Sequence, residues 1–66
     1  MEIQVNGVAH RVADRLTAAQ LIDVLGLQEH RLAMEVNREI VPRSCLETHW
    51  LNPGDQVEIV RAIGGG

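Results

Sequence analysis

The stretch LTAAQLIDVLGL, residues 16–27, carries a complete set of signals for one short helix. Thr17 is a preferred N-cap residue, and Gln20 follows it by three positions, which is the spacing of a capping box. Gly26 suits the left-handed position that commonly ends a helix. The stretch therefore predicts a helix of about nine residues.

This helix has an apolar stripe and is too short to be stable alone. Ala18, Leu21, Ile22 and Leu25 follow the spacing that places side chains on one helix face. Isolated helices shorter than about 12–15 residues are marginal in water. The stripe must therefore be buried against another element, and the flanking sequence indicates a β-sheet.

A β-hairpin is predicted before the helix, in MEIQVNGVAHRV at residues 1–12. Apolar and polar residues alternate, and Asn6-Gly7 is the strongest short hairpin signal because a type I′ turn needs φ > 0 at both positions. The resulting register pairs Ile3 with His10, which puts His10 on the apolar face.

Three further strands are predicted after the helix, in RLAMEVN (31–37), EIV (39–41) and LNPGDQVEIVR (51–61). The last of these begins with a Pro-Gly turn, after which Val57 and Ile59 face inward and Val60 faces the opposite side. Residues 43–50 show no clean period and are predicted to form a loop with one helical turn. The sequence thus predicts an α+β fold: a mixed sheet of about five strands in the order ββαβββ, with one main helix packed on one face.

Composition narrows the possible functions. A domain near 60 residues buries only about 60% of its unfolded surface, which leaves little room for an active-site cavity. The net charge is −3 and no basic stripe is present, so nucleic-acid binding is not expected. No apolar run reaches the length of a membrane span and no signal peptide is recognisable, so we expect a soluble, cytoplasmic protein that does not associate with membranes.

The side chains that could carry chemistry are sparse. His10, His30 and His49 lack metal-ligand spacing, and no metal site is expected. Cys45 and His49 are four residues apart and would share a helix face, but no third orienting group accompanies them, so a semi-buried thiol beside a surface imidazole is expected. Trp50, the only aromatic residue, is predicted to plug the core.

The last three residues, Gly64, Gly65 and Gly66, have no structural task that the sequence reveals. Ordering a backbone costs about 1–2 kcal/mol per residue, and glycine loses the most freedom of all residues. These glycines are therefore predicted to serve a purpose other than folding.

The sequence as a whole resembles the ThiS family of sulfur carriers in thiamine biosynthesis, which have a β-grasp, ubiquitin-like fold. The resemblance rests on MEIQVNG at the start, on AMEVNREIVPR at 33–43 and on GDQVEIVRAIGGG at 54–66. It implies a single β-grasp domain over residues 1–66 with a flexible glycine tail at 62–66.

The resemblance also implies a function for the terminal carboxylate of Gly66. A ThiF-type adenylyltransferase would adenylate it with ATP, and a persulfide sulfur derived from a cysteine desulfurase would convert it to a thiocarboxylate, or 1-thioglycine. Thiazole synthase, ThiG, would receive that sulfur. The chain would then be a protein cosubstrate that binds no cofactor and is not itself an enzyme, and Cys45 would have no family role.

Delivery requires the tail to enter a partner. Residues 62–66, when extended, span about 17 Å, which is long enough to thread Gly64, Gly65 and Gly66 into an active site. Val60 and Ile63 are predicted to be docking contacts at the root of this tail.

Three alternatives remain open on sequence grounds. The small subunit of molybdopterin synthase uses the same di-glycine end. A ubiquitin-like modifier would be joined through Gly66 to lysines of other proteins. A plain β-grasp interaction module would make no use of its tail.

Overall fold

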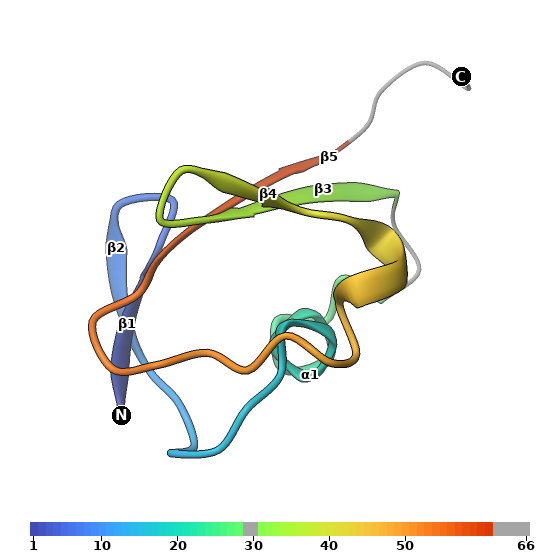
Figure 1. Ribbon diagram of the computed structural model, residues 1–66. Helices are drawn as coiled ribbons and strands as arrows, with labels where there is room; N and C mark the ends of the chain where they lie inside the picture. Colours follow the sequence, from blue (N-terminus) through green and yellow to red (C-terminus); the bar gives the residue numbers. More distant parts are fainter. Residues whose placement is uncertain (29–30, 62–66) are drawn as a thin grey trace.

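The computed structural model describes residues 1–28 and 31–61 (Figure 1). The elements are β1 (Glu2–Val5), β2 (Val8–Arg11), α1 (Ala18–Val24), β3 (Leu32–Val36), β4 (Glu39–Val41), the 3₁₀ turn η1 (Arg43–Cys45) and β5 (Gln56–Arg61). Their order confirms the predicted ββαβββ arrangement, and η1 is the helical turn expected in the loop. His30 and residues 62–66 lie outside the described part of the chain.

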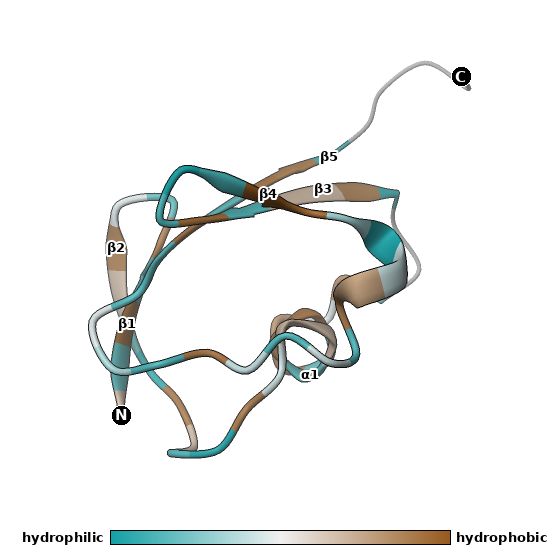
Figure 2. Cartoon of the chain, viewed as in Figure 1, coloured by the Kyte–Doolittle hydropathy of each residue, from teal (hydrophilic) through white to brown (hydrophobic). Residues whose placement is uncertain are grey.

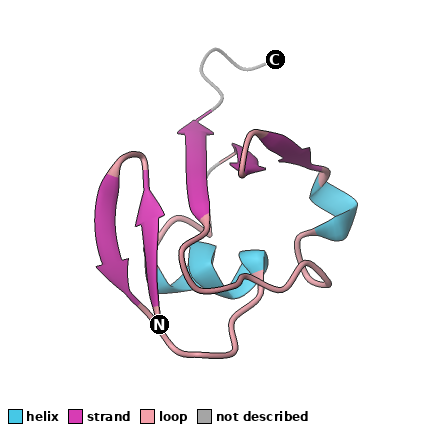
Figure 3. Ribbon diagram, turned by 60° about the vertical axis from the view of Figure 1, so that its left-hand side comes forward, coloured by secondary structure: helices cyan, strands magenta, loops and turns pink. Residues whose placement is uncertain are grey.

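The five strands form one mixed sheet in the order β2-β1-β5-β3-β4. Neighbours pair antiparallel except for β1 and β5, which run parallel. The last strand of the chain therefore lies at the centre of the sheet. α1 covers one side of it (Figures 1 and 3), which confirms the predicted β-grasp fold with a helix on one face.

Both hairpins turn through left-handed residues. Asn6 and Gly7 have φ of 51° and 81°, as a type I′ turn requires, and Ile3 pairs with His10 as predicted. The second turn uses Asn37 at φ 52° and Arg38 at φ 69°. Asparagine tolerates this region better than most residues, which explains why it leads both turns.

The caps of α1 follow the sequence signals closely. The Thr17 hydroxyl accepts the Gln20 N–H at 3.2 Å, and the Gln20 side-chain oxygen accepts the Thr17 N–H at 2.9 Å, forming the capping box. At the other end Gly26, with φ 72°, donates to Asp23 O, and Leu27 donates to Ile22 O, both at 3.0 Å. This Schellman ending leaves α1 with seven residues, two fewer than the predicted nine.

The core fills the space between the sheet and α1, and hydrophobic residues lie along the strands and α1 around this interior (Figure 2). Its buried apolar residues are Ile3, Val5, Leu16, Ala18, Leu21, Ile22, Met34, Val36, Val41, Leu51, Val57 and Ile59. All are aliphatic, so the stability of the fold depends on close packing of Val, Ile and Leu rather than on aromatic side chains.

The prediction that Trp50 plugs the core is wrong. Trp50 is 53% exposed, whereas its neighbour Leu51 is 3% exposed and occupies the core position. The backbone decides this: Leu51 N–H donates to Leu16 O at 2.9 Å, and successive side chains of an extended segment face opposite ways. The Trp50 ring instead lies on the surface, with the Arg15 guanidinium carbon 5.7 Å from its centroid.

Within residues 1–28 and 31–61, no helix has the length and apolar character that a bilayer crossing requires.

We predict that Thr17→Val, which keeps the side-chain shape but removes the hydroxyl, lowers the free energy of unfolding by about 1 kcal/mol because the Gln20 N–H loses its acceptor in the capping box. For a domain of this size that loss corresponds to a fall in Tm of roughly 4–8 °C. Thr48→Val is the matched control, since the exposed Thr48 hydroxyl makes only a 3.3 Å bond within a loop. Equal shifts in the thermal melts of the two variants would contradict a stabilising role for the cap.

Candidate functional site

The central strand β5, which ends at Arg61, immediately precedes the tail at residues 62–66 in the sequence and is the first part of the candidate site. Val57 and Ile59 are buried at 1% and 8% exposure, whereas Val60 is 64% exposed. The predicted facing of these three side chains is therefore confirmed. The other predicted site residues, Ile63, Gly64, Gly65 and Gly66, lie outside the described residues.

Val60 does not lie alone on the open side of the sheet. Its direct cross-strand partner on β3 is Ala33, and Ile40 of the neighbouring strand β4 is 74% exposed on the same side. Together they border a shallow hollow of about 180 Å³. We call Ala33, Ile40 and Val60 the outer-face patch.

Two carboxylates border the outer-face patch. Glu35 on β3 and Glu58 on β5 are directly opposed in the register, and both line the same hollow. Like charges in this position destabilise a sheet rather than support it. Their arrangement therefore favours a binding surface that combines apolar contacts with attraction for a cationic side chain.

Asparagine side chains from the two hairpin turns hold β5 near both of its ends. The Asn6 amide oxygen accepts the Ile59 N–H at 2.8 Å, and its NH₂ group donates to Ile59 O at 3.2 Å. At the start of the strand, the Asn37 amide oxygen accepts the Gln56 N–H at 3.0 Å, and its NH₂ group donates to the Asp55 carboxylate, also at 3.0 Å.

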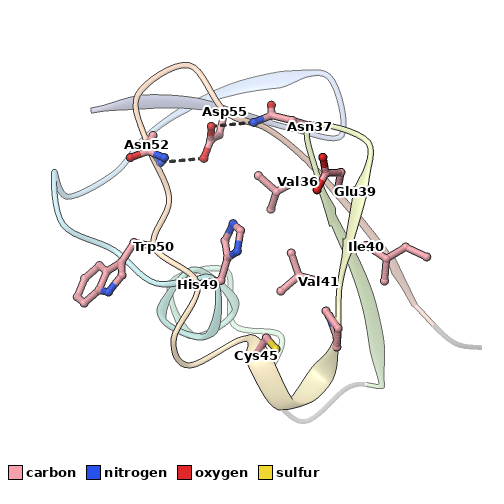
Figure 4. Close-up of a pocket in the computed structure, with 11 residues that line it drawn as sticks. Val36, Asn37, Glu39, Ile40, Val41, Cys45, His49, Trp50, Asn52 and Asp55 are labelled. Atoms are coloured by element: carbon pink, nitrogen blue, oxygen red, sulfur yellow. Dashed lines mark hydrogen bonds between the residues drawn. The ribbon is translucent and has the colours of Figure 1, made fainter.

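A larger cleft of about 380 Å³ lies between β4 and the loop of residues 49–55 (Figure 4). His49 points into it and is partly buried, whereas the Cys45 thiol is exposed, which is the reverse of the expected pairing. The two residues are joined only through the backbone, by a 2.9 Å bond from His49 N–H to Cys45 O.

The buried carboxylate beside this cleft already has its partners. Asp55 is 6% exposed and accepts hydrogen bonds from Asn37 and from the Asn52 N–H, the latter at 2.8 Å. Among the described residues, no group of three His, Cys, Asp or Glu side chains could hold a metal ion. The carboxylate therefore serves to fix the turn before β5.

Sequence reasoning missed two parts of this site. Ile40 precedes the inward-facing Val41, so alternation alone would place Ile40 on the open face, but only the register of β3 with both β4 and β5 brings it near Val60. The bonds from Asn6 to β5 join residues 53 positions apart and leave no local sequence signal.

Comparisons with known proteins agree with this geometry. Residues 3–66 match the family model described as "ThiS family". The chain is 32% identical to the sulfur carrier protein ThiS of Escherichia coli, with full coverage of both chains. It is also 38% identical over 66 residues to a thiazole synthase of Paramagnetospirillum magneticum, of which it spans only 20%.

A solved structure extends the likeness to the fold. The crystal structure of the thiamine biosynthesis protein ThiS from Geobacter metallireducens superimposes with a TM-score of 0.87 at 29% identity, and the match covers both chains completely. Sequence, strand order and central position of the last strand thus lead to the same assignment: the chain belongs to the ThiS family.

Proposed function

We propose that this chain is a sulfur carrier of thiamine biosynthesis whose reacting group is the terminal carboxylate of Gly66. The observation that carries the proposal is the family match, which runs through Gly66 itself. The complete overlap with the E. coli carrier protein supports it further.

The chemistry proposed for Gly66 has three steps. A free C-terminal carboxylate has a pKa near 3.3–3.7 and is therefore an anion and a poor electrophile at neutral pH. A ThiF-type adenylyltransferase joins it to the AMP part of ATP and releases pyrophosphate. A persulfide sulfur, derived from a cysteine desulfurase, then displaces AMP, and reductive cleavage of the sulfur–sulfur bond by a thiol leaves the thiocarboxylate.

Thiazole synthase is the proposed recipient of this sulfur. The P. magneticum relative supports the pairing, because a segment similar to this whole chain occurs within a larger protein of that name. The carrier contributes delivery rather than catalysis, and ATP is bound by the activating partner. Glycines suit the delivery because they have no Cβ to clash in a narrow channel.

The outer-face patch is the proposed docking surface for the activating enzyme. Only Arg61 separates Val60 from the tail at residues 62–66, so a partner that receives Gly66 would lie over the adjacent part of the sheet. The opposed Glu35 and Glu58 favour a partner surface with an arginine or lysine beside its apolar contacts. Ile63 would extend these contacts along the tail.

We predict that the mass of the chain rises by the difference between one sulfur and one oxygen atom when it is incubated with the activating enzyme, ATP, a persulfide donor and a thiol reductant. One alanine added after Gly66 should abolish this increase, because the reacting carboxylate is then displaced onto a residue with a side chain. Intact mass spectrometry measures both results.

Gly64→Ala is the control for the added residue, since it alters the tail but leaves the terminal Gly65-Gly66 pair unchanged. It should still acquire sulfur. An extended chain that forms thiocarboxylate without being trimmed would refute the proposed role of Gly66.

We predict that Val60→Asp raises the KM of the activating enzyme for the carrier roughly tenfold, the equivalent of about 1.4 kcal/mol, because a charge enters an apolar contact beside two existing carboxylates. The change in KM is measured from steady-state rates of adenylation, with the released pyrophosphate as the signal. The domain should remain folded because Val60 contributes nothing to the buried core.

Val24→Asp provides a matched control, since Val24 has the same 64% exposure as Val60 but lies on α1, on the other side of the sheet. The KM of the activating enzyme for Val24→Asp should stay close to its KM for the unmodified chain. Equal KM values for the two aspartate variants would remove the outer-face patch from the interface.

A further inference from the structure

The side chain of Asn6 continues the pairing of β1 with β5 after β1 has ended. In a parallel ladder each paired residue donates to the residue before its partner and accepts from the residue after it. Gln4 N–H donates to Asp55 O and Asn6 N–H donates to Val57 O, both at 2.9 Å. The next bond in this series would join Ile59 N–H to the main-chain carbonyl of Asn6.

The turn removes that carbonyl from the ladder, and the side chain replaces it. Asn6 has φ 51° because it begins the tight turn into β2. Its amide oxygen accepts the Ile59 N–H at 2.8 Å, and its NH₂ group donates to Ile59 O at 3.2 Å. One asparagine therefore supplies both hydrogen bonds that a longer β1 would have made to Ile59.

The bonds from the Asn6 side chain hold β5 close to where the tail begins. The β1 ladder has residue pairs only at Gln4–Gln56 and Val5–Val57. On the other edge, β3 pairs with β5 as far as Arg61. Without the Asn6 side chain, β5 would be held by β3 alone from Glu58 onwards. Its last residues could then move away from β1.

We propose that Asn6 is a positioning residue for the reaction at Gly66: by holding Ile59 on the edge opposite β3, it fixes the direction in which the chain leaves the sheet towards a partner's active site. This inference rests on the proposed function. It assigns Asn6 a task beyond turn formation, for which glycine would serve equally well.

The chain contains a matched control for this role. Asn37 occupies the same position in the second hairpin turn, with φ 52°, and its side chain also accepts one main-chain N–H and donates one hydrogen bond, both at 3.0 Å. These bonds hold the start of β5, at Gln56 and Asp55. Asn37→Gly thus removes the same number of bonds as Asn6→Gly, but at the end of β5 farther from the tail, and one of its two bonds goes to the Asp55 carboxylate instead of a main-chain carbonyl.

The first measurement uses the isolated chain. Amide hydrogen exchange and ¹⁵N relaxation are compared in the unmodified protein, Asn6→Gly and Asn37→Gly. Asn6→Gly should speed exchange at Ile59 and lower the backbone order of Val60 and Arg61, whereas Asn37→Gly should act at Gln56 and leave Val60 and Arg61 unchanged. Unchanged order at Val60 and Arg61 in Asn6→Gly would overturn the proposal.

The second measurement is the rate of adenylation by the activating enzyme, corrected for the folded fraction of each variant. Asn6→Gly should lower kcat/KM by roughly tenfold, because a misdirected tail reaches the reacting geometry less often. Asn37→Gly should retain the unmodified rate. Asn6→Asp, which keeps the acceptor for Ile59 N–H but loses the donor to Ile59 O, should fall between the unmodified chain and Asn6→Gly.

Equal losses in Asn6→Gly and Asn37→Gly would show that Asn6 has only a structural role and would refute the positioning role. A failure of the proposed function is distinguishable, because the unmodified chain itself would then not be adenylated. In that case, the exchange and relaxation data still decide whether Asn6 directs the end of β5.

Discussion

The parallel pairing of β1 with β5 is the contact on which the rest of the structure depends. It joins the hairpin at the beginning of the chain to the three strands of the second half, which would otherwise form a separate antiparallel sheet. Only the joined sheet offers α1 a face wide enough to bury Ala18, Leu21 and Ile22. The ladder itself has only two residue pairs, so the side-chain bonds of Asn6 complete a joint that the backbone leaves short.

The sequence predicted well those features whose causes lie within a few residues. The capping box needs only Thr17 and Gln20, and a type I′ turn needs only Asn6-Gly7, so local chemistry specifies both. The prediction for Trp50 is wrong because composition favours burial of a large side chain, whereas the hydrogen bond from Leu51 N–H to Leu16 O, 35 residues earlier, decides which neighbour faces inward. Long-range register is information that no short window of sequence contains.

The features of the candidate site also fall into two groups, those with a local sequence signal and those that depend on long-range register. The chemistry proposed for Gly66 depends on residue type and on family resemblance and stays a prediction, whereas alternation alone correctly predicted that Val60 faces outward. The outer-face patch needed the register, because Ala33, Ile40 and Val60 come from three different strands. The two roles of asparagine show the limit most clearly: the residue type that makes the turn also supplies a hydrogen bond to a distant strand, and only the first role has a local signature.

Under the proposed function, in which the chain brings its terminal carboxylate to a partner, the central position of β5 matters. A terminal edge strand would be bonded on one side only, and its direction would vary with every fluctuation of that edge. Here β3 and Asn6 together hold the strand on both edges at Ile59, three residues before the tail. Each residue that becomes ordered on binding costs about 1–2 kcal/mol of conformational entropy. Because the end of β5 is already held in the sheet, it adds nothing to this cost. Under the proposed function, a short glycine segment is then sufficient, because the sheet sets its direction and the tail has only to provide the reach.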